Sequence, residues 1–494
     1  MNADDVPAER HVTDASTAEE SATTAGRAVV MFVRNDCTTD VRVLREAATL
    51  HEAGWRTTIV ALQPGGPDAP PDREERGGVE IIRVAAPGDW RVRWRDMRYY
   101  PWRSLRGLPR QAIRELRTGS GGLGRAAMMG VVALVSMPYT LVQAVRYVAS
   151  RRARPRPHTR DDGFDHLAWW RLSVLGWAAR AVAAAPPADV YHGHDLTGLP
   201  AALRAAARGA AAPSVGRPAV VYDSHELFVE ASTVARQAWW VRRILAAAER
   251  RWIRGVDAVV TVNEAIGVEL QRRYGGPTPV VVHNAPPRRP ATIPRPDHIR
   301  AATGIGADER IVLYHGAFVQ GRGLEILAEA IREPPLRKAH LVYLGYGSMQ
   351  TEVDGLAADP RSEGRIHVLP AVPPDVLLDW VASADVAAVI IQPTTLNHRL
   401  SSPNKLFEAM AAGVPVVVSD LPVMAAIVRA TGCGLVVDAK DPGAIAAACA
   451  RIIDAPPEES AAWRQRALDA AHDRYNWERE SLELLALYDR LAAR

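Results

Sequence analysis

The chain has 494 residues, of which 48% are hydrophobic and 23% are charged. This length divides into two or more domains with their own cores, and the composition excludes a wholly disordered chain. The three cysteines, Cys37, Cys433 and Cys449, lie far apart. Their spacing excludes a disulfide framework and a cysteine metal site, and it fits a reducing cytosol.

The positive charge is concentrated in one part of the chain. Residues 91–160 contain sixteen arginines but only two acidic residues, Asp96 and Glu115, which gives this stretch a net charge of +14. Since the whole chain carries +4, the remainder carries −10. Such an asymmetry predicts an anionic partner for the stretch.

The first 26 residues are polar and lack an apolar run, so 1–26 is predicted to be a disordered tail rather than a signal peptide. Strand patterns then alternate with helical patterns, which is typical of parallel sheets in α/β domains. The first set comprises a helix at 41–54 and strands at 28–33, 57–62, 79–84, 188–195, 219–226, 256–263 and 279–286.

A stretch rich in proline and arginine at 286–297 predicts a linker before a second set of strands. These strands are expected at 310–316, 340–347, 365–372, 384–391 and 416–418. The predicted parts are an N-terminal domain at 27–285 with an insert at 88–160, a linker at 286–300, a C-terminal domain at 301–474 and a helix at 475–494 that packs back on the N-terminal domain. Two doubly wound, Rossmann-like parallel-sheet domains place a ligand cleft between the carboxyl ends of both sheets.

Residues 401–420, SSPNKLFEAMAAGVPVVVSD, predict a helix followed by a buried strand. Ser402 suits the position that caps a helix, and Pro403 suits the first helical position. The free N–H groups at a helix start attract phosphate, and Lys405 would add to that attraction. Glu408 would need another partner, such as sugar hydroxyls. The alternative is a solvated helix in which Lys405 and Glu408 form an ordinary ion pair.

This stretch closely resembles the donor-binding segment of the GT-B glycosyltransferases of family 4. The resemblance extends from residue 28 to residue 490, and seven further segments occur in the family's order. They are DVRVLREAATLHEAGW, DVYHGHDLTGLPAAL, VVYDSHELF, DAVVTVNEAIGVEL, VVVHNAP, YHGAFVQGRGLEIL and YNWERESLELLALY. The resemblance implies the GT-B fold, a nucleotide-sugar donor held by the C-terminal domain and an acceptor held mostly by the N-terminal domain.

The resemblance assigns Glu408 to the ribose hydroxyls of the donor. Family members place another glutamate, in contact with the donor sugar, where this chain has Leu400. They also often place a basic residue directly after the first glycine of GAFVQGRGLE, where this chain has Ala317. We therefore expect Lys405 to supply the charge that is missing at that turn.

Two glycine-rich turns follow strands of the second set. The turn that begins at Gly316 could bring backbone N–H groups close to a diphosphate, with Arg322 supplying charge. The alternative is an ordinary turn with an exposed arginine. Gly345 and Gly347 are too few for a dinucleotide fingerprint, and the resemblance places them beside the nucleotide. The remaining donor-binding residues expected are Ser402 and Asn404.

Histidines and acidic residues follow two strands of the first set. DSHE resembles the place where a family histidine faces the donor sugar, so His225 is the first candidate for catalysis. His194, Asp195 and Glu226 are expected on the acceptor side, and His192 is expected to be structural. Such pairs can also bind a metal ion or transfer protons. No third ligand cluster and no Asp-x-Asp motif accompanies them, so neither a metal nor another cofactor is expected.

The insert at 88–160 combines arginines and aromatic residues with twenty uncharged residues at 126–145. A nucleic-acid surface is one interpretation. An anionic membrane surface fits better, because Trp and Tyr lie at headgroup level and arginine attracts acidic lipids. Arginines flank the run on both sides, which favours an interfacial or re-entrant helix, or a solvated or core helix, over a true crossing.

Together these features predict a metal-independent hexosyltransferase that binds no nucleic acid, and the family resemblance implies that it retains the anomeric configuration. It would move a sugar from a nucleotide-diphosphate sugar to a lipid-linked or cell-surface glycan acceptor at the cytoplasmic face of the plasma membrane. Catalysis would rest on His225, with Arg322 and Lys405 stabilising the departing diphosphate. The alternatives are a non-catalytic sugar-nucleotide-binding protein, suggested by Leu400 and Ala317, and another GT-B-fold enzyme such as a nucleotide-sugar epimerase.

Overall fold

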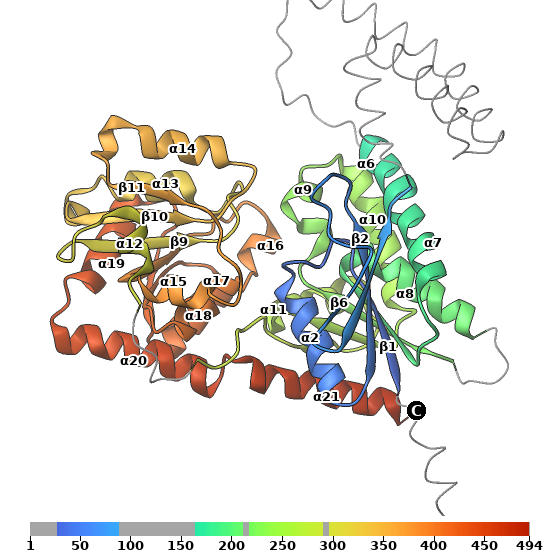
Figure 1. Cartoon of the computed structure of the whole chain (residues 1–494). Coiled ribbons are helices and arrows are strands. Elements are labelled where there is room, and N and C mark those ends of the chain that lie inside the picture. Colours follow the sequence, from blue (N-terminus) through green and yellow to red (C-terminus); the bar gives the residue numbers. More distant parts are fainter. Residues whose placement is uncertain (1–26, 88–163, 211–216, 290–295, 494) are drawn as a thin grey trace, which may run out of the picture.

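A computed structural model of the chain describes residues 27–87, 164–210, 217–289 and 296–493. In these residues the chain forms two α/β domains, each built on one sheet (Figure 1). The predicted tail at 1–26 and the predicted insert at 88–160 lie outside the described residues.

The N-terminal domain contains eight strands in the order β3-β4-β2-β1-β5-β6-β7-β8. Neighbouring strands are parallel except β3 and β4, which pair in antiparallel fashion. The strands are β1 (Ala28–Phe32), β2 (Arg56–Gln63), β3 (Arg73–Arg76), β4 (Val79–Ala85), β5 (Val190–His194), β6 (Ala219–Ser224), β7 (Ala258–Thr261) and β8 (Val280–Val281).

Helices cover both faces of this sheet because its central strands are buried on both sides. Along β1, Val30 and Phe32 belong to one core, whereas Val29 and Met31 belong to the other. The first core is closed by α7, α8, α10 and α11, and the second by α2 and α21. The helices of this domain are α2 (Val41–Glu52), α6 (Phe164–Trp169), the π-helix η1 (Trp170–Val174), α7 (Leu175–Ala184), α8 (Asp195–Gly209), η2 (Phe228–Glu230), α9 (Ser232–Ala235), α10 (Trp239–Ile253) and α11 (Glu264–Tyr274).

The C-terminal domain contains six parallel strands in the order β11-β10-β9-β12-β13-β14. They are β9 (Arg310–His315), β10 (Ala339–Leu344), β11 (Ile366–Leu369), β12 (Val386–Val389), β13 (Val416–Ser419) and β14 (Gly434–Val437). The helices are α12 (His298–Thr303), α13 (Leu324–Ala330), η3 (Pro334–Leu336), α14 (Gln350–Ala358), η4 (Pro360–Ser362), α15 (Leu377–Ala382), α16 (Leu396–Arg399), α17 (Asn404–Ala411), α18 (Pro422–Thr431), α19 (Pro442–Ile453), α20 (Pro457–Asp473) and α21 (Trp477–Ala492). The predicted class of two doubly wound α/β domains is therefore confirmed.

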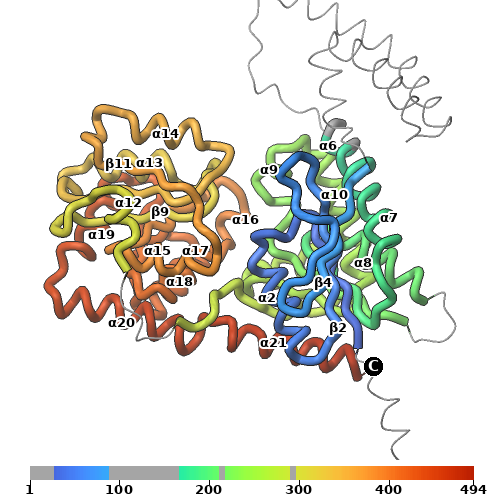
Figure 2. The backbone as a smooth tube through the Cα atoms, viewed as in Figure 1, coloured from blue at the N-terminus to red at the C-terminus, as the bar shows by residue number. Residues whose placement is uncertain are grey.

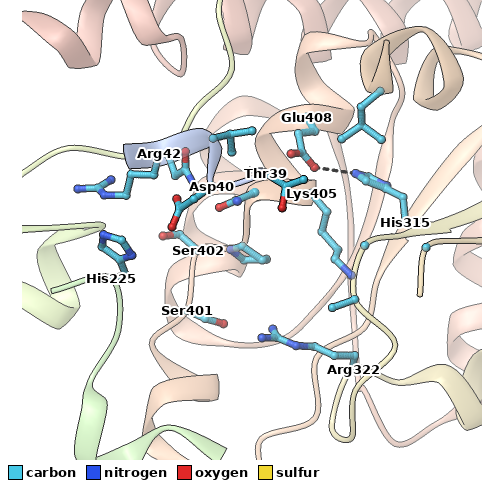
Figure 3. A pocket seen from close by; sticks show the side chains of 18 of the residues that line it. Thr39, Asp40, Arg42, His225, His315, Arg322, Ser401, Ser402, Lys405 and Glu408 are labelled. Carbon is cyan, nitrogen blue, oxygen red and sulfur yellow. Dashed lines mark hydrogen bonds and ion pairs between the residues drawn. The ribbon is translucent and has the colours of Figure 1, made fainter. Parts of the chain in front are cut away.

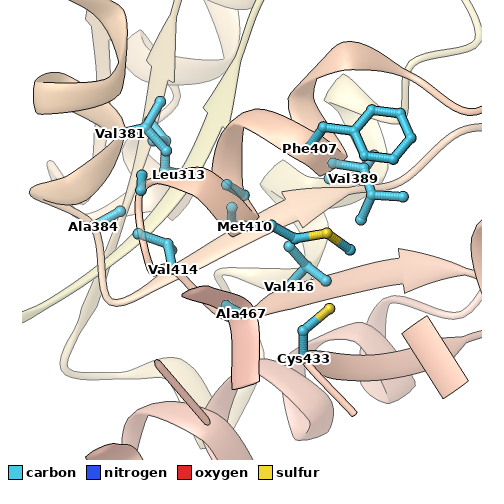
Figure 4. Close-up of a cluster of buried hydrophobic side chains, with 14 of the residues drawn as sticks. Leu313, Val381, Ala384, Val389, Phe407, Met410, Val414, Val416, Cys433 and Ala467 are labelled. Carbon is cyan, nitrogen blue, oxygen red and sulfur yellow. The ribbon is translucent and has the colours of Figure 1, made fainter. Parts of the chain in front are cut away.

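Helix α17 is fixed by its apolar face. Phe407 and Met410 are fully buried and lie beside Val389 of β12 and Val416 of β13 (Figure 4). The helix gives way to β13 through Gly413, whose φ of 65° is left-handed and costs glycine little. The predicted helix and strand of this segment are confirmed, and tight packing holds the start of α17 in place.

Three details differ from the prediction. Strand β3 was not predicted because it consists only of arginine and glutamate and has no apolar alternation. Strand β14 was not predicted because it begins with a glycine, a residue that is depleted in strands and typical of turns. The strand expected at 279–286 shortens to β8, because the chain then leaves the sheet and Ala285 already belongs to the core of the other domain.

The two C-terminal helices connect the domains a second time (Figure 2). Helix α20 packs against α17 of the C-terminal domain, and α21 packs against α2 and β8 of the N-terminal domain. Trp477 is buried at the start of α21, and its indole N–H donates to Thr49 Oγ1 of α2 at 2.9 Å. The N-terminal domain therefore takes part of its core from the far end of the chain.

We expect Trp477→Ala to lower the free energy of unfolding by about 3–5 kcal/mol, because it removes a buried indole and leaves a cavity. Urea unfolding followed by circular dichroism measures the change. Leu482→Ala, on the same helix but 62% exposed, is the control and should change the free energy by less than about 0.5 kcal/mol. Equal effects of the two substitutions would contradict the packing of α21.

Candidate functional site

A cavity of about 570 Å³ lies between the carboxyl ends of the two sheets. Figure 3 shows His225 on one side of it and His315, Arg322 and Lys405 on the other. The predicted residues that line it are His225, Glu226, Gly316, Arg322, Gly345, Ser402, Asn404, Lys405 and Glu408. Three predicted residues, His194, Asp195 and Gly347, are not part of the lining.

The first turn of α17 faces the cavity without a side-chain cap. The predicted cap is wrong, because the Ser402 hydroxyl accepts a hydrogen bond from Asn263 Nδ2 at 2.9 Å instead. Pro403, expected inside the helix, precedes it. Since no side chain satisfies the first N–H groups, they can serve an anion in the cavity.

Lys405 extends from this turn and lies over the ring of Tyr314, with Nζ 3.6 Å from the ring centroid. The Tyr314 hydroxyl donates to the Ala317 carbonyl oxygen at 2.7 Å, which holds the ring in place. Burial, and then the nearby charge of Arg322, lower the pKa of Lys405 well below its usual value. The charge of an anion in the cavity would oppose both effects and favour the charged ammonium.

Glu408 makes its contact with His315 at the end of β9, where Oε2 lies 2.9 Å from Nε2 (Figure 3). The ion pair between Lys405 and Glu408 that the sequence left open does not form within the described residues. The other carboxylate oxygen of Glu408 has no hydrogen-bond partner in that part of the chain. It can therefore accept a hydrogen bond from a hydroxyl in the cavity.

The two glycine-rich turns fit into each other. The N–H of Phe318 donates to the carbonyl oxygen of Tyr346 at 2.8 Å, and that of Gly316 donates to the carbonyl oxygen of Leu344 at 2.9 Å. A Cβ on Gly347 would lie 2.2 Å from the Phe318 carbonyl oxygen. The absence of a side chain at 347 thus serves the packing of the turns, and Gly316 and Tyr346 line the cavity.

His225 is held on the other side of the cavity by two carboxylates. Its Nε2 lies 3.1 Å from Asp223 Oδ2, and its Nδ1 lies 3.4 Å from Asp195 Oδ2. Burial alone would lower the pKa of His225, but Asp195 and Asp223 outweigh it and raise the pKa to about 10. The raised pKa favours a charged imidazolium at the cavity. Asp195 itself has a φ of 54°, a conformation uncommon for residues with a side chain.

Asp223 is paired in turn with Arg42 of α2. The guanidinium contacts both carboxylate oxygens, with Nε to Oδ2 at 2.8 Å and Nη2 to Oδ1 at 2.9 Å. Its Nη1 also donates to the Val282 carbonyl oxygen at 2.7 Å. Burial would raise the pKa of Asp223, but Arg42, and then His225, hold it well below its usual value. Asp223 therefore stays ionised beneath His225.

Glu46, His192, His194 and Asp223 present possible metal ligands within 4.8 Å of one another. The expectation that no further ligand group joins the histidines is therefore wrong. Arg42 already contacts both carboxylates, with Nε 3.0 Å from Glu46 Oε1. Burial, and then the charge of Asp223, raise the pKa of Glu46 well above its usual value, so a neutral carboxyl is favoured. The absence of a bound metal ion stays a prediction.

The two remaining histidines of β5 lie deeper in the N-terminal domain and are fully buried. The register of the sheet pairs His194 with Asp223, which places Nδ1 3.3 Å from Oδ2. His192 Nδ1 lies 2.9 Å from the Tyr488 hydroxyl of α21, as fits the structural role expected for it. His194 supports Asp223 and His225 from below rather than lining the cavity.

Helix α16 joins the two domains along one edge of the cavity. Asn397 contacts Glu226 and Leu227, and His398 Nε2 lies 2.9 Å from Ser232 Oγ. Leu400 packs against the hydrophobic core of the N-terminal domain. Its side chain therefore contributes apolar contact between the domains and no hydrogen bond to the cavity.

Several of these residues were missed in the sequence. Asp223 lies within the quoted segment DSHE, and Arg42 and Glu46 lie within the helix that follows the first strand. Arg42 and Glu46 lie in a segment whose pattern predicts an amphipathic helix. Charged residues are rarely buried, so a pair of opposite charges on the apolar face of that helix could have indicated a buried ion pair. His315 and Asn397 carried no local signal, because their partners lie in distant parts of the chain.

Residues 309–455 match the family described as Glycosyl transferases group 1, and residues 121–285 match Glycosyltransferase Family 4. The chain belongs to the GT-B glycosyltransferases. The D-inositol 3-phosphate glycosyltransferase of Xylanimonas cellulosilytica is 26% identical to this glycosyltransferase over 344 residues, which cover 61% of this chain and 80% of that protein. D-inositol 3-phosphate glycosyltransferase 1 of Catenulispora acidiphila is 27% identical over 332 residues, which cover 64% and 75%.

Solved structures agree on the fold of this glycosyltransferase. Sucrose-phosphate synthase from Thermosynechococcus elongatus matches with a TM-score of 0.62 and 17% identity, covering 94% of this chain and 99% of that one. Anabaena HepE in complex with UDP and glucose matches with a TM-score of 0.57 and 13% identity, covering 94% and 100%. The predicted GT-B fold is confirmed.

We expect the stability that His225 provides to depend on pH. Its pKa in the folded chain, about 10, lies above the ordinary value of 6.5. The stabilisation is therefore complete below the ordinary value and is lost as the pH rises through the folded value. Urea midpoints of the wild type and His225→Gln, measured from about pH 6 to about pH 10, should converge as the pH rises. The exposed His472 provides the control, because His472→Gln should give no such convergence. A constant difference for His225→Gln would contradict the charged imidazolium.

Proposed function

We propose that this glycosyltransferase moves a sugar from a nucleotide-diphosphate sugar to a hydroxyl of a glycan or lipid-linked acceptor. The observation that carries the proposal is that positively charged groups line the C-terminal side of the cavity. Lys405, Arg322 and the uncapped start of α17 line it from the C-terminal domain. Together they suit a diphosphate, whose charge grows as the sugar departs.

The ribose of the donor is assigned to Glu408. His315 fixes one carboxylate oxygen at 2.9 Å and leaves the other for the ribose hydroxyls. This residue is one helical turn beyond Lys405, so a single helix would contact both the diphosphate and the nucleoside. HepE, which was solved with UDP and glucose, shares this fold.

His225 would act as a cation rather than as a base. Because Asp195 and Asp223 raise its pKa to about 10, it has no free electron pair to accept a proton near neutral pH. We propose retention, in which the bond from the anomeric carbon to the phosphate oxygen breaks and the acceptor oxygen bonds to the same face of that carbon. The acceptor proton then passes to the departing phosphate, and no enzyme carboxylate becomes a nucleophile.

An acceptor without a phosphate group suits the described N-terminal side of the cavity. That lining contributes Asp40 and Glu226 as acids. Its arginine, Arg42, is engaged with Asp223 and Glu46. Within the described residues, this side therefore offers no unengaged arginine or lysine to a phosphate. The relatives named for D-inositol 3-phosphate suggest the alternative of a phosphorylated acceptor.

A donor screen tests this function. Isothermal titration with UDP-, GDP-, ADP- and dTDP-sugars, in EDTA, should show binding of one nucleotide class. A separate assay of free nucleotide should show its slow release over time. Lys405→Ala and Glu408→Ala should each weaken binding by roughly 10-fold or more, because each removes a charged hydrogen-bonding partner.

Lys440→Ala, which removes an exposed lysine of the same domain, is the matched control and should bind as the wild type does. Binding that needs a divalent cation would contradict metal independence. Binding without turnover would favour the non-catalytic alternative, and no binding at all would contradict the proposed function.

We also propose that the basic segment at 88–160 brings the enzyme to the cytoplasmic face of an anionic membrane, where a lipid-linked acceptor is found. Its support is the net charge of +14 on residues 91–160. Among the residues that the structure describes, no helix is both long and apolar enough to cross a bilayer.

We expect the full chain to sediment with vesicles that contain about one third phosphatidylserine and not with neutral vesicles, and to be released by salt. Replacing the arginines of 91–110 with glutamine should abolish sedimentation while leaving donor binding intact. Sedimentation that survives this change would contradict the role of these arginines.

A further inference from the structure

Glu226 reaches the cavity from the N-terminal domain, directly after His225. Its Oε2 accepts a hydrogen bond from Asn397 Nδ2 at 2.7 Å. No described residue bonds to its Oε1, and the residue lines the cavity. One carboxylate oxygen is thus fixed by the protein and the other is left for a ligand.

Asn397 holds this carboxylate from the opposite domain. Its Oδ1 accepts the backbone N–H of Leu227 at 3.0 Å, so both ends of the amide are bonded and its orientation is set. Only 7% of Asn397 is exposed. Because Asn397 belongs to α16, the position of Glu226 depends on the contact between the two domains.

The charges around Glu226 place it between the two functional sides of the cavity. Burial, and then the charge of Asp195, raise the pKa of Glu226 to about 7, while Arg322 and His225 act in the opposite direction. Glu226 lines the same cavity as Arg322, which is assigned to the diphosphate, and as His225 on the other side. The part of a bound donor that lies between these two sides is the transferred sugar.

The other acidic residues of the described lining, Asp40 and Glu408, have other partners. Asp40 caps α2 by accepting the N–H of Val43 at 3.3 Å, and its second oxygen accepts from Asn35 at 2.7 Å. Glu408 keeps one oxygen free but lies with His315 on the nucleoside side. Glu226 is thus the acid in this lining whose free oxygen is available to the transferred sugar.

We propose that Glu226 determines which donor sugar is accepted, by taking a hydrogen bond from a sugar hydroxyl at Oε1, and that Asn397 is its positioning residue. This assignment moves Glu226 from the expected acceptor side to the donor sugar, and it rests on the proposed function. Because the acid and its support come from different domains, the sugar is recognised only when the domains are in contact.

The test compares a nucleotide diphosphate with its sugar nucleotides on the full chain, by isothermal titration without acceptor. The probes are UDP, UDP-glucose, UDP-galactose, GDP and GDP-mannose. In the wild type, one sugar nucleotide should bind more tightly than the matching diphosphate. Glu226→Gln should reduce that advantage roughly 10-fold and leave the affinity for the diphosphate within about 2-fold, since the amide keeps the shape but loses the charged acceptor.

Two further variants separate recognition from general damage. Asn397→Ala should also reduce the advantage of the sugar nucleotide, because Glu226 loses its support. Glu325→Gln removes an exposed acid of α13 that does not line the cavity, and it should behave as the wild type does. Thermal unfolding of all variants shows whether they are folded.

The outcomes distinguish the two proposals. An unchanged advantage in Glu226→Gln, or no advantage in the wild type while the diphosphate still binds, would overturn the role of Glu226 and leave the donor site in place. Failure of the wild type to bind any of the diphosphates and sugar nucleotides would overturn the proposed function itself. Since no acceptor is present, a role of Glu226 in acceptor binding could not produce the expected result.

Discussion

The ion pair of Arg42 and Asp223 lies beneath the cavity, and the arrangement of the N-terminal side depends on it. Both side chains are almost completely buried, so the charge of each is compensated by the other, and Asp223 depends on Arg42 to remain ionised. Asp223 in turn holds His225, and Arg42 joins α2 to the strand end at Val282. Replacing either partner would leave a single charge in the interior, at a cost of about 3–5 kcal/mol. The N-terminal side of the cavity is therefore built outward from a buried ion pair.

The C-terminal side is built on a different physical basis. There the apolar packing of Phe407 and Met410 fixes α17. Within the described residues no side chain caps the start of this helix, and Lys405 lies over an aromatic ring. A rigid helix whose first turn is uncapped is suited to bind an anion, whereas a network of buried charges is suited to orient a single histidine.

Local patterns in the sequence predicted the fold and much of the site, because each pattern belongs to one element. The alternation of strands and helices predicted both sheets, and the apolar face of α17 predicted its packing. Contacts between distant residues could not be predicted in this way. Arg42 and Asp223 are separated by 181 positions, and Ser402 bonds to Asn263 rather than to its own helix. A residue that can satisfy a local turn can equally satisfy a distant partner, and only the packed structure decides between them.

The position of α21 has a consequence for biosynthesis. Trp477, Leu484 and Tyr488 complete the hydrophobic core that β1 and α2 begin at the start of the N-terminal domain. On the ribosome, the strands of this domain emerge long before α21, and the whole C-terminal domain is made in between. The part of this face that α21 covers therefore stays apolar and exposed until α21 has been synthesised. The N-terminal domain can therefore complete this core only after the C-terminal domain has been made, and its apolar surface is open to other contacts during that interval.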